Sequence, residues 1–251
     1  MQLSIMFSDT KYIENSFNIF FPRQSEIRKQ AFALEELLKA DYSEPQIIPV
    51  PDNFDPEVPR IIFSSKHGFS HILISQVNII MNVRYSSDYQ IDASKGKQYL
   101  KERVPRLFQL LAKIDGMKPH FCGLSTRVDI PCNQTDAAVI KHLSSLLLKN
   151  GDTKNRHDVQ VKFTDVVENK YFSNITIQNY RTWEIDQSAS LPALSSSAVT
   201  ERGVRLGGDF NDRRAYNEDS SYNPNVRDVP KIIEKAFSIL EHFISKVRQK
   251  S

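Results

Sequence analysis

The sequence predicts an α+β fold, built from antiparallel β-meanders with helices packed on one face. Short segments with apolar residues at every second position indicate half-buried strands, and strands joined by short turns must run antiparallel. Two segments, 99–114 and 229–247, carry apolar residues at helical spacing. Three strands and a helix occur between residues 60 and 114 and again between 158 and 247. We therefore expect two similar halves, 1–116 and 117–251, packed together as one compact unit.

Composition excludes several classes of protein. A chain of 251 residues can bury a substantial core, and a net charge of +3 is too small to indicate nucleic-acid binding by itself. No apolar run approaches the ~18 residues of a membrane span. Two cysteines cannot form a disulfide framework, so we expect reduced thiols and a cytoplasmic protein with no membrane contact.

The N-terminal part contains strands, a helix and a strap. Alternating apolar residues predict strands at 3–7 and 17–21, and Ser25 is expected to cap a helix over 27–38. Five prolines between residues 42 and 59 indicate an extended surface strap without regular structure.

The central unit is the clearest part of the pattern. Strands are expected near 61–63, 72–74 and 77–85, with a tight reversal near Gln76. Pro105 interrupts the helix that follows, so we expect a kink or two abutting helices.

The second half begins with a strand over 122–130 and a helix capped by Asn133 or Thr135. Strands at 159–163 and 175–185 follow, with the turn between them at 169–170. A third strand, 204–210, is expected to be interrupted at Gly207–Gly208. The final helix starts at Asp228 and buries a stripe of seven apolar residues: Val229, Ile233, Ala236, Phe237, Leu240, Ile244 and Val247.

The usual chemical motifs are missing. His120, Cys122 and Cys132 lack the paired spacing of a zinc site, and the spacing of His67 and His71 does not suggest a metal site either. Cys122 could act as a nucleophile with His120 or His142, but its strand position points it into the core. Gly207–Gly208 is not a phosphate loop. We expect no metal site, no cofactor and no catalytic residue.

One stretch, 202–222, could form a ligand site. Nearby carboxylates can hold a divalent cation, and arginines interleaved with tyrosines can grip phosphates and stack on bases. The Ser- and Ala-rich segment 186–200 reads as a mobile loop that could close over a ligand. The alternative is a solvated turn whose charges pair with one another. The candidate ligand-binding residues are Arg205, Asp209, Asp212, Arg213 and Arg214.

The run "EVPRIIFSSKHGFSHILISQVNIIMNVRYSSDY", followed by a helix and "LSTRVDIP", resembles a sporadically distributed family of uncharacterised bacterial proteins. The resemblance covers the middle half of the chain and implies a bacterial or phage origin and a cytoplasmic setting. It brings no catalytic residues. The opening "KYIENSFNIFFP" resembles the start of the SecB export chaperone.

Three functions remain open. The absence of catalytic motifs favours a binding or assembly protein that acts through protein–protein contacts, either with a partner protein or with itself as a homo-oligomer. A nucleic-acid- or nucleotide-binding protein, including a metal-dependent nuclease, would use Asp209 and Asp212 as ligands and Arg213 as a charge stabiliser. A SecB-like chaperone would instead bind peptides at sheet edges and apolar grooves.

Overall fold

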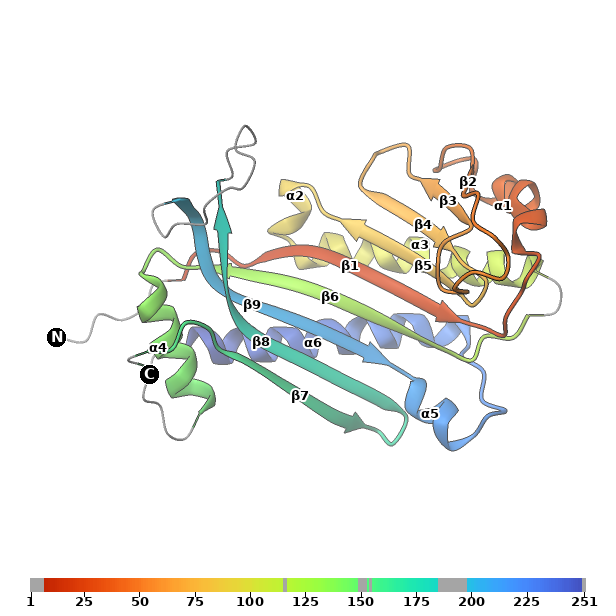
Figure 1. Ribbon diagram of the computed structural model, residues 1–251. Coiled ribbons are helices and arrows are strands. Elements are labelled where there is room, and N and C mark those ends of the chain that lie inside the picture. The colour runs from red at the N-terminus through yellow and green to blue at the C-terminus, as the bar shows by residue number, and fades with distance from the viewer. Residues whose placement is uncertain (1–6, 115–116, 149–152, 154, 185–197, 250–251) are drawn as a thin grey trace.

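The computed structural model describes residues 7–114, 117–148, 153, 155–184 and 198–249. They form an α+β fold with one nine-stranded antiparallel sheet, in the order β2-β3-β4-β5-β1-β6-β9-β8-β7 (Figure 1). The strands are β1 (Lys11–Phe20), β2 (Gln46–Ile47), β3 (Ile61–Ser64), β4 (Ser70–Ile74), β5 (Asn78–Arg84), β6 (Phe121–Pro131), β7 (Gln160–Val167), β8 (Tyr171–Trp183) and β9 (Val199–Asn211).

Two long helices and several short ones complete the fold. The long helices are α3 (Ala93–Lys113) and α6 (Val229–Arg248). The others are η1 (Ile27–Gln30), α1 (Ala31–Leu38), α2 (Ser87–Gln90), α4 (Asp136–Leu147), α5 (Arg213–Glu218) and η3 (Val226–Asp228). The described residues contain no helix with the length and apolar character needed to span a membrane.

The sheet is arranged symmetrically about its central pair, β1 and β6. The meander β3-β4-β5 and helix α3 follow β1 in the chain, and the meander β7-β8-β9 and helix α6 follow β6. The position between residues 116 and 117 separates these two sets of elements. Both sets nevertheless belong to one sheet, because β1 of the first set pairs along its length with β6 of the second.

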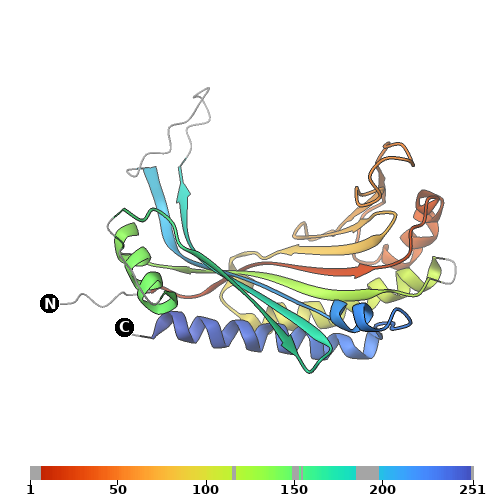
Figure 2. The same ribbon diagram turned by 60° about the horizontal axis from the view of Figure 1, so that its bottom comes forward.

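The core lies between the sheet and the two long helices, which contact each other and run along one face (Figure 2). The seven residues of the predicted stripe in α6 are all buried, and Ile232 joins them. The sheet contributes alternate residues to this core, among them Phe17, Ile19, Ile79, Met81, Leu124, Val128, Leu206 and Phe210. The α+β class predicted from the sequence is confirmed, and the two long helices lie on one face of the sheet.

Several local predictions are corrected. Strand β9 runs without a break through Gly207 and Gly208. A Cβ at Gly208 would lie 3.1 Å from Leu240, so this glycine lets α6 approach the sheet closely. Helix α3 is one helix through Pro105, which rules out two abutting helices. The N-cap of η1 is Glu26 rather than Ser25, and it makes no side-chain cap.

Two turns form without the expected residues. Between β4 and β5, the hydroxyl of Ser75 accepts hydrogen bonds from the N–H groups of Val77 and Asn78, which explains how this reversal forms without glycine. The β7–β8 turn centres on Glu168 and Asn169, both with positive φ, one residue before the predicted position.

The remaining predictions have mixed outcomes. Thr135 caps α4 by accepting a hydrogen bond from the N–H of Ala138, as one of the two expected candidates. The proline-rich strap contains one short strand, β2, which pairs with β3. The predicted strand at 3–7 lies outside the described residues except for Phe7, which bridges to Cys132. Most of the predicted loop 186–200 also lies outside them.

Candidate functional site

The sheet face opposite α3 and α6, the open face, is not covered by either of the two long helices. In Figure 2 the end of β8 and the start of β9 rise on one side of the middle of the sheet, and β3 and β4 rise on the other, away from the helices. Among the described residues, no helix lies over the centre of this face. The open face is therefore a broad trough whose floor consists of side chains from alternate positions of the strands.

Strand register aligns polar residues across the floor. One line of such residues, the polar row, crosses eight strands from β3 to β7, because each of its residues is the direct register partner of the next. At about 4.8 Å between strands it extends roughly 34 Å. In spatial order the polar row is Ser64, His71, Asn82, Ser16, Ser125, Asp209, Asn174 and Thr164.

The next row along the strands, the charged row, has alternating charge. Glu14 lies between two arginines, 3.1 Å from the Arg127 guanidinium and 3.9 Å from that of Arg84. Further along, Gly207 provides no side chain. In spatial order the charged row is Arg84, Glu14, Arg127, Gly207, Thr176 and Lys162.

Apolar side chains gather on the other side of the polar row. Ile62, Leu73 and Ile80 are register partners on β3, β4 and β5, and each is half-buried. Beside them the rings of Phe20 and Phe121 stack with centroids 4.4 Å apart. These five residues, the apolar corner, are not part of the core cluster. They expose apolar surface on the open face.

Two hollows lie in the open face and share Glu14 and Ser16. The central hollow, of about 310 Å³, lies over β1, β6, β7, β8 and β9. The second hollow, of about 650 Å³, extends from β1 over β5 and β4 to His71 and Arg84. They are neighbours, and both lie over residues of the polar and charged rows.

Two of the five residues predicted from the sequence, Arg205 and Asp209, lie on the open face. Both oxygens of Asp129 accept hydrogen bonds of 2.7 Å from the guanidinium of Arg205, which also lies 4.8 Å from the centre of the Tyr180 ring. The carboxylate of Asp129 raises the pKa of Arg205 further. Arg205 is thus neutralised within the fold, whereas Asp209 lines the central hollow.

Asp212 is fully buried and serves the fold. Its carboxylate accepts hydrogen bonds from the backbone N–H of Cys122 at 2.7 Å and from the hydroxyl of Tyr222 at 2.8 Å. Burial raises the pKa of Asp212 above its usual value, although both hydrogen bonds oppose that shift. The group joins β6 to the segment after α5, and it does not face the hollow that Asp209 lines.

Arg213 and Arg214 belong to α5. The guanidinium of Arg213 lies 5.3 Å from the centre of the Phe121 ring, at the border of the apolar corner. Arg214 pairs with Glu218 at 3.4 Å. The structure therefore does not bring the five predicted residues into one site. The segment expected to close over them lies largely outside the described residues.

The described residues contain no group of three or more histidine, cysteine or carboxylate side chains that could hold a metal ion. His120 precedes β6 and stacks on Tyr216 with ring centroids 4.7 Å apart. Cys122 is fully buried, and burial raises the pKa of its thiol well above the usual value. A neutral, enclosed thiol is a poor nucleophile.

Sequence reasoning missed Glu14, Ser16, Lys162 and Asn174. The signal was available in part, because they occupy the polar positions of alternating strands. Their meeting depends on which strands are neighbours, and β1 pairs with β6 more than 100 residues later in the chain. Alternation within one strand cannot show that.

No protein-family model matches this sequence, and no curated protein does either. The resemblance to uncharacterised bacterial proteins remains an expectation.

Proposed function

We propose that this chain is a binding protein that takes up an extended segment of a partner protein across the open face of its sheet. The observation that carries the proposal is the side-by-side arrangement of the polar row and the apolar corner, on a face that no described helix covers. Protein interfaces combine apolar anchors with surrounding hydrogen-bonding groups in this way.

The apolar corner supplies the anchor. Phe20 and Phe121 form one stacked pair, and the side chains of Ile62, Leu73 and Ile80 form a row beside them. Half-exposed aliphatic and aromatic residues in one patch gain free energy when a partner covers them. Aromatic residues contribute most of the binding free energy in many protein interfaces.

The polar row supports an extended occupant. Its hydroxyl, amide and imidazole groups can exchange hydrogen bonds with a polypeptide backbone. A row of roughly 34 Å matches about ten residues of extended chain at about 3.3 Å per residue.

The charge distribution favours a polypeptide over a nucleic acid. Three cations of the open face pair with carboxylates of the same face: Arg205 with Asp129, Arg127 with Glu14 and Lys11 with Glu201. Nucleic acids need cations free to neutralise phosphates. Paired cations leave little net positive charge for that purpose.

A display library of random 12-residue peptides tests the proposal. We expect selection on the wild-type protein to enrich binders that lose affinity for Ser125→Arg, which places a long cation in the middle of the polar row. Ser238→Arg is the matched control, because Ser238 is exposed on α6 and its replacement adds the same charge away from the open face. The selected peptides should bind Ser238→Arg as tightly as they bind the wild type.

The result also separates the alternatives. Binders that respond equally to both variants, or no enriched binder, contradict the proposal. Enrichment of many unrelated apolar peptides at the open face points to a chaperone, and one shared motif points to a dedicated partner. A single-stranded oligonucleotide that binds the wild type, and whose affinity changes in Ser125→Arg but not in Ser238→Arg, favours the nucleic-acid reading.

A further inference from the structure

The central hollow contains two charged groups that the fold leaves without counter-ions. Its four charged lining residues are Glu14, Arg127, Lys162 and Asp209. Glu14 and Arg127 neutralise each other at 3.1 Å. Within the part of the chain that the structure describes, Asp209 and Lys162 have no oppositely charged side chain at ion-pair distance.

Neutral groups hold the Asp209 carboxylate in place. It accepts hydrogen bonds of 2.9 Å from the amides of Asn174 and Asn211, and a longer one of 3.4 Å from the hydroxyl of Ser125. These donors orient the carboxylate and leave its charge uncompensated. A preorganised anion loses little side-chain entropy when it meets a cation.

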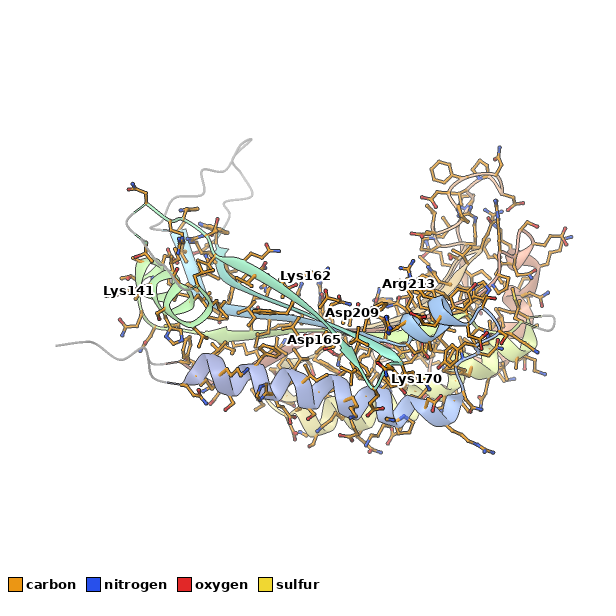
Figure 3. All side chains as sticks on the ribbon, turned by 90° about the horizontal axis from the view of Figure 1, so that it is seen from below. Lys141, Lys162, Asp165, Lys170, Asp209 and Arg213 are labelled. Atoms are coloured by element: carbon orange, nitrogen blue, oxygen red, sulfur yellow. The ribbon has the colours of Figure 1, made fainter. Side chains whose placement is uncertain are left out.

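The floor beside Asp209 is open. An added Cβ at Gly207 would have only Thr176 within 4 Å, at 3.9 Å. Gly207 therefore leaves room for an incoming side chain, next to Asp209 on the same strand. Figure 3 shows Asp209 and Lys162 on the side of the sheet away from α6, with Asp165 nearer the helix.

The spacing of the two charges sets a spacing in the ligand. Asp209 on β9 and Lys162 on β7 are two strands apart, and register places them one row apart along the strands. Strand geometry then puts their Cα atoms about 12 Å from each other. In an extended chain that distance corresponds to roughly three or four residues.

We propose that the bound segment places a lysine or arginine against Asp209 and an aspartate or glutamate against Lys162, three or four residues apart. This inference rests on the proposed function and specifies the chemistry of its partner. A mixed-charge segment fits the hollow better than a uniformly charged one. A uniformly basic segment would place a cation against Lys162, and a uniformly acidic segment would place an anion against Asp209.

Synthetic peptides from the display selection test the inference by titration. For the best binder we expect replacement of its basic residue by glutamine to weaken binding to the wild type about fivefold, the upper range for a solvent-accessible ion pair. The same replacement should have no effect on binding to Asp209→Asn. Replacement of the acidic residue of the peptide by glutamine should likewise weaken binding to the wild type and have no effect on binding to Lys162→Gln.

Matched controls exclude general charge effects. Asp165→Asn removes a carboxylate from β7 on the other face, and Lys141→Gln removes an exposed cation from α4 (Figure 3). Both should retain the wild-type response to each peptide. Binders that lie on the open face but show no coupling to Asp209 or Lys162 overturn this inference alone. Binders insensitive to Ser125→Arg overturn the proposed function itself.

Discussion

The carboxylate of Asp212 accepts a 2.7 Å hydrogen bond from the backbone N–H of Cys122, 90 residues earlier in the chain. Together with the bond from Tyr222, it fastens the segment after β9 to the central strand β6. Because Asp212 is fully buried, its loss would leave the buried N–H of Cys122 and the partly buried hydroxyl of Tyr222 without their acceptor.

Asp212→Ala should therefore lower the free energy of unfolding by at least about 2 kcal/mol, and Tyr222→Phe by about 1 kcal/mol, because it removes one bond. Urea denaturation measures both. Asp165→Ala, which truncates an exposed carboxylate, should change stability little. A loss in Asp212→Ala no larger than in Asp165→Ala would show that the buried bonds contribute nothing net.

The pKa of Asp212 predicts a pH dependence. Burial raises it above 3.8, so between 3.8 and the folded-state pKa the native protein holds a proton that the unfolded chain has lost. In that window the contribution of Asp212 to stability falls as pH rises. Asp212→Asn has no titrating group there, so its deficit relative to wild type should shrink as pH increases. A deficit that grows with pH would mean that the folded-state pKa is lowered.

Phe237 tests the importance of α6. Its side chain is fully buried and stacks on Tyr12 with ring centroids 5.7 Å apart. Phe237→Ala should cost about 3–5 kcal/mol, since it removes a large core side chain and leaves a cavity. Ser238→Ala, one residue further and exposed, is the control for helix propensity. Equal thermal midpoints for the two variants would place α6 outside the core.

Two glycines of β9 should respond in opposite ways to alanine. A Cβ at Gly203 would lie 2.1 Å from the carbonyl oxygen of Ile130, so the backbone would have to shift. We expect Gly203→Ala to cost about 1–3 kcal/mol or more. Gly207→Ala meets open space and should be neutral or stabilising by up to about 1 kcal/mol. Chemical denaturation of the two variants measures both changes in the free energy of unfolding. Similar losses of stability at both positions would contradict the packing described.

Self-association remains a prediction, and the structure narrows its route. The stripe of α6 is buried, so it cannot serve a dimer. Among the described strands β7 is the last of the sheet and pairs on one side only, and Val166 on it is 47% exposed. We expect a dimer mass by light scattering at micromolar concentration, and a monomer for Val166→Lys, which adds charge to the edge. A monomer mass for the wild-type protein removes the prediction.

The sequence was sufficient for the elements but not for their assembly. Period-two alternation located most strands, and helical spacing identified the buried stripe of α6, because each pattern is set by near neighbours in the chain. Gly208 misled the strand prediction, since its role is contact with Leu240 on a distant helix. Asp212 looked like a surface ligand because its partners, Cys122 and Tyr222, become neighbours only after folding.

The candidate site depended even more on distant pairing. Asp209 was singled out for the arginines near it in sequence, yet its contacts are Ser125, Asn174 and Asn211. Only the strand order brings Asp209 and Lys162 into one hollow.

The central claim is that a polypeptide segment binds across the open face, and amide chemical shifts recorded during titration with a selected 12-residue peptide test it most directly. We predict that the largest shifts follow the polar row across β1, β6, β9 and β8, including Ser16, Ser125 and Asn174, with little change in α3 and α6. Shifts confined to the edge of β7 or to the helices would contradict binding across the open face.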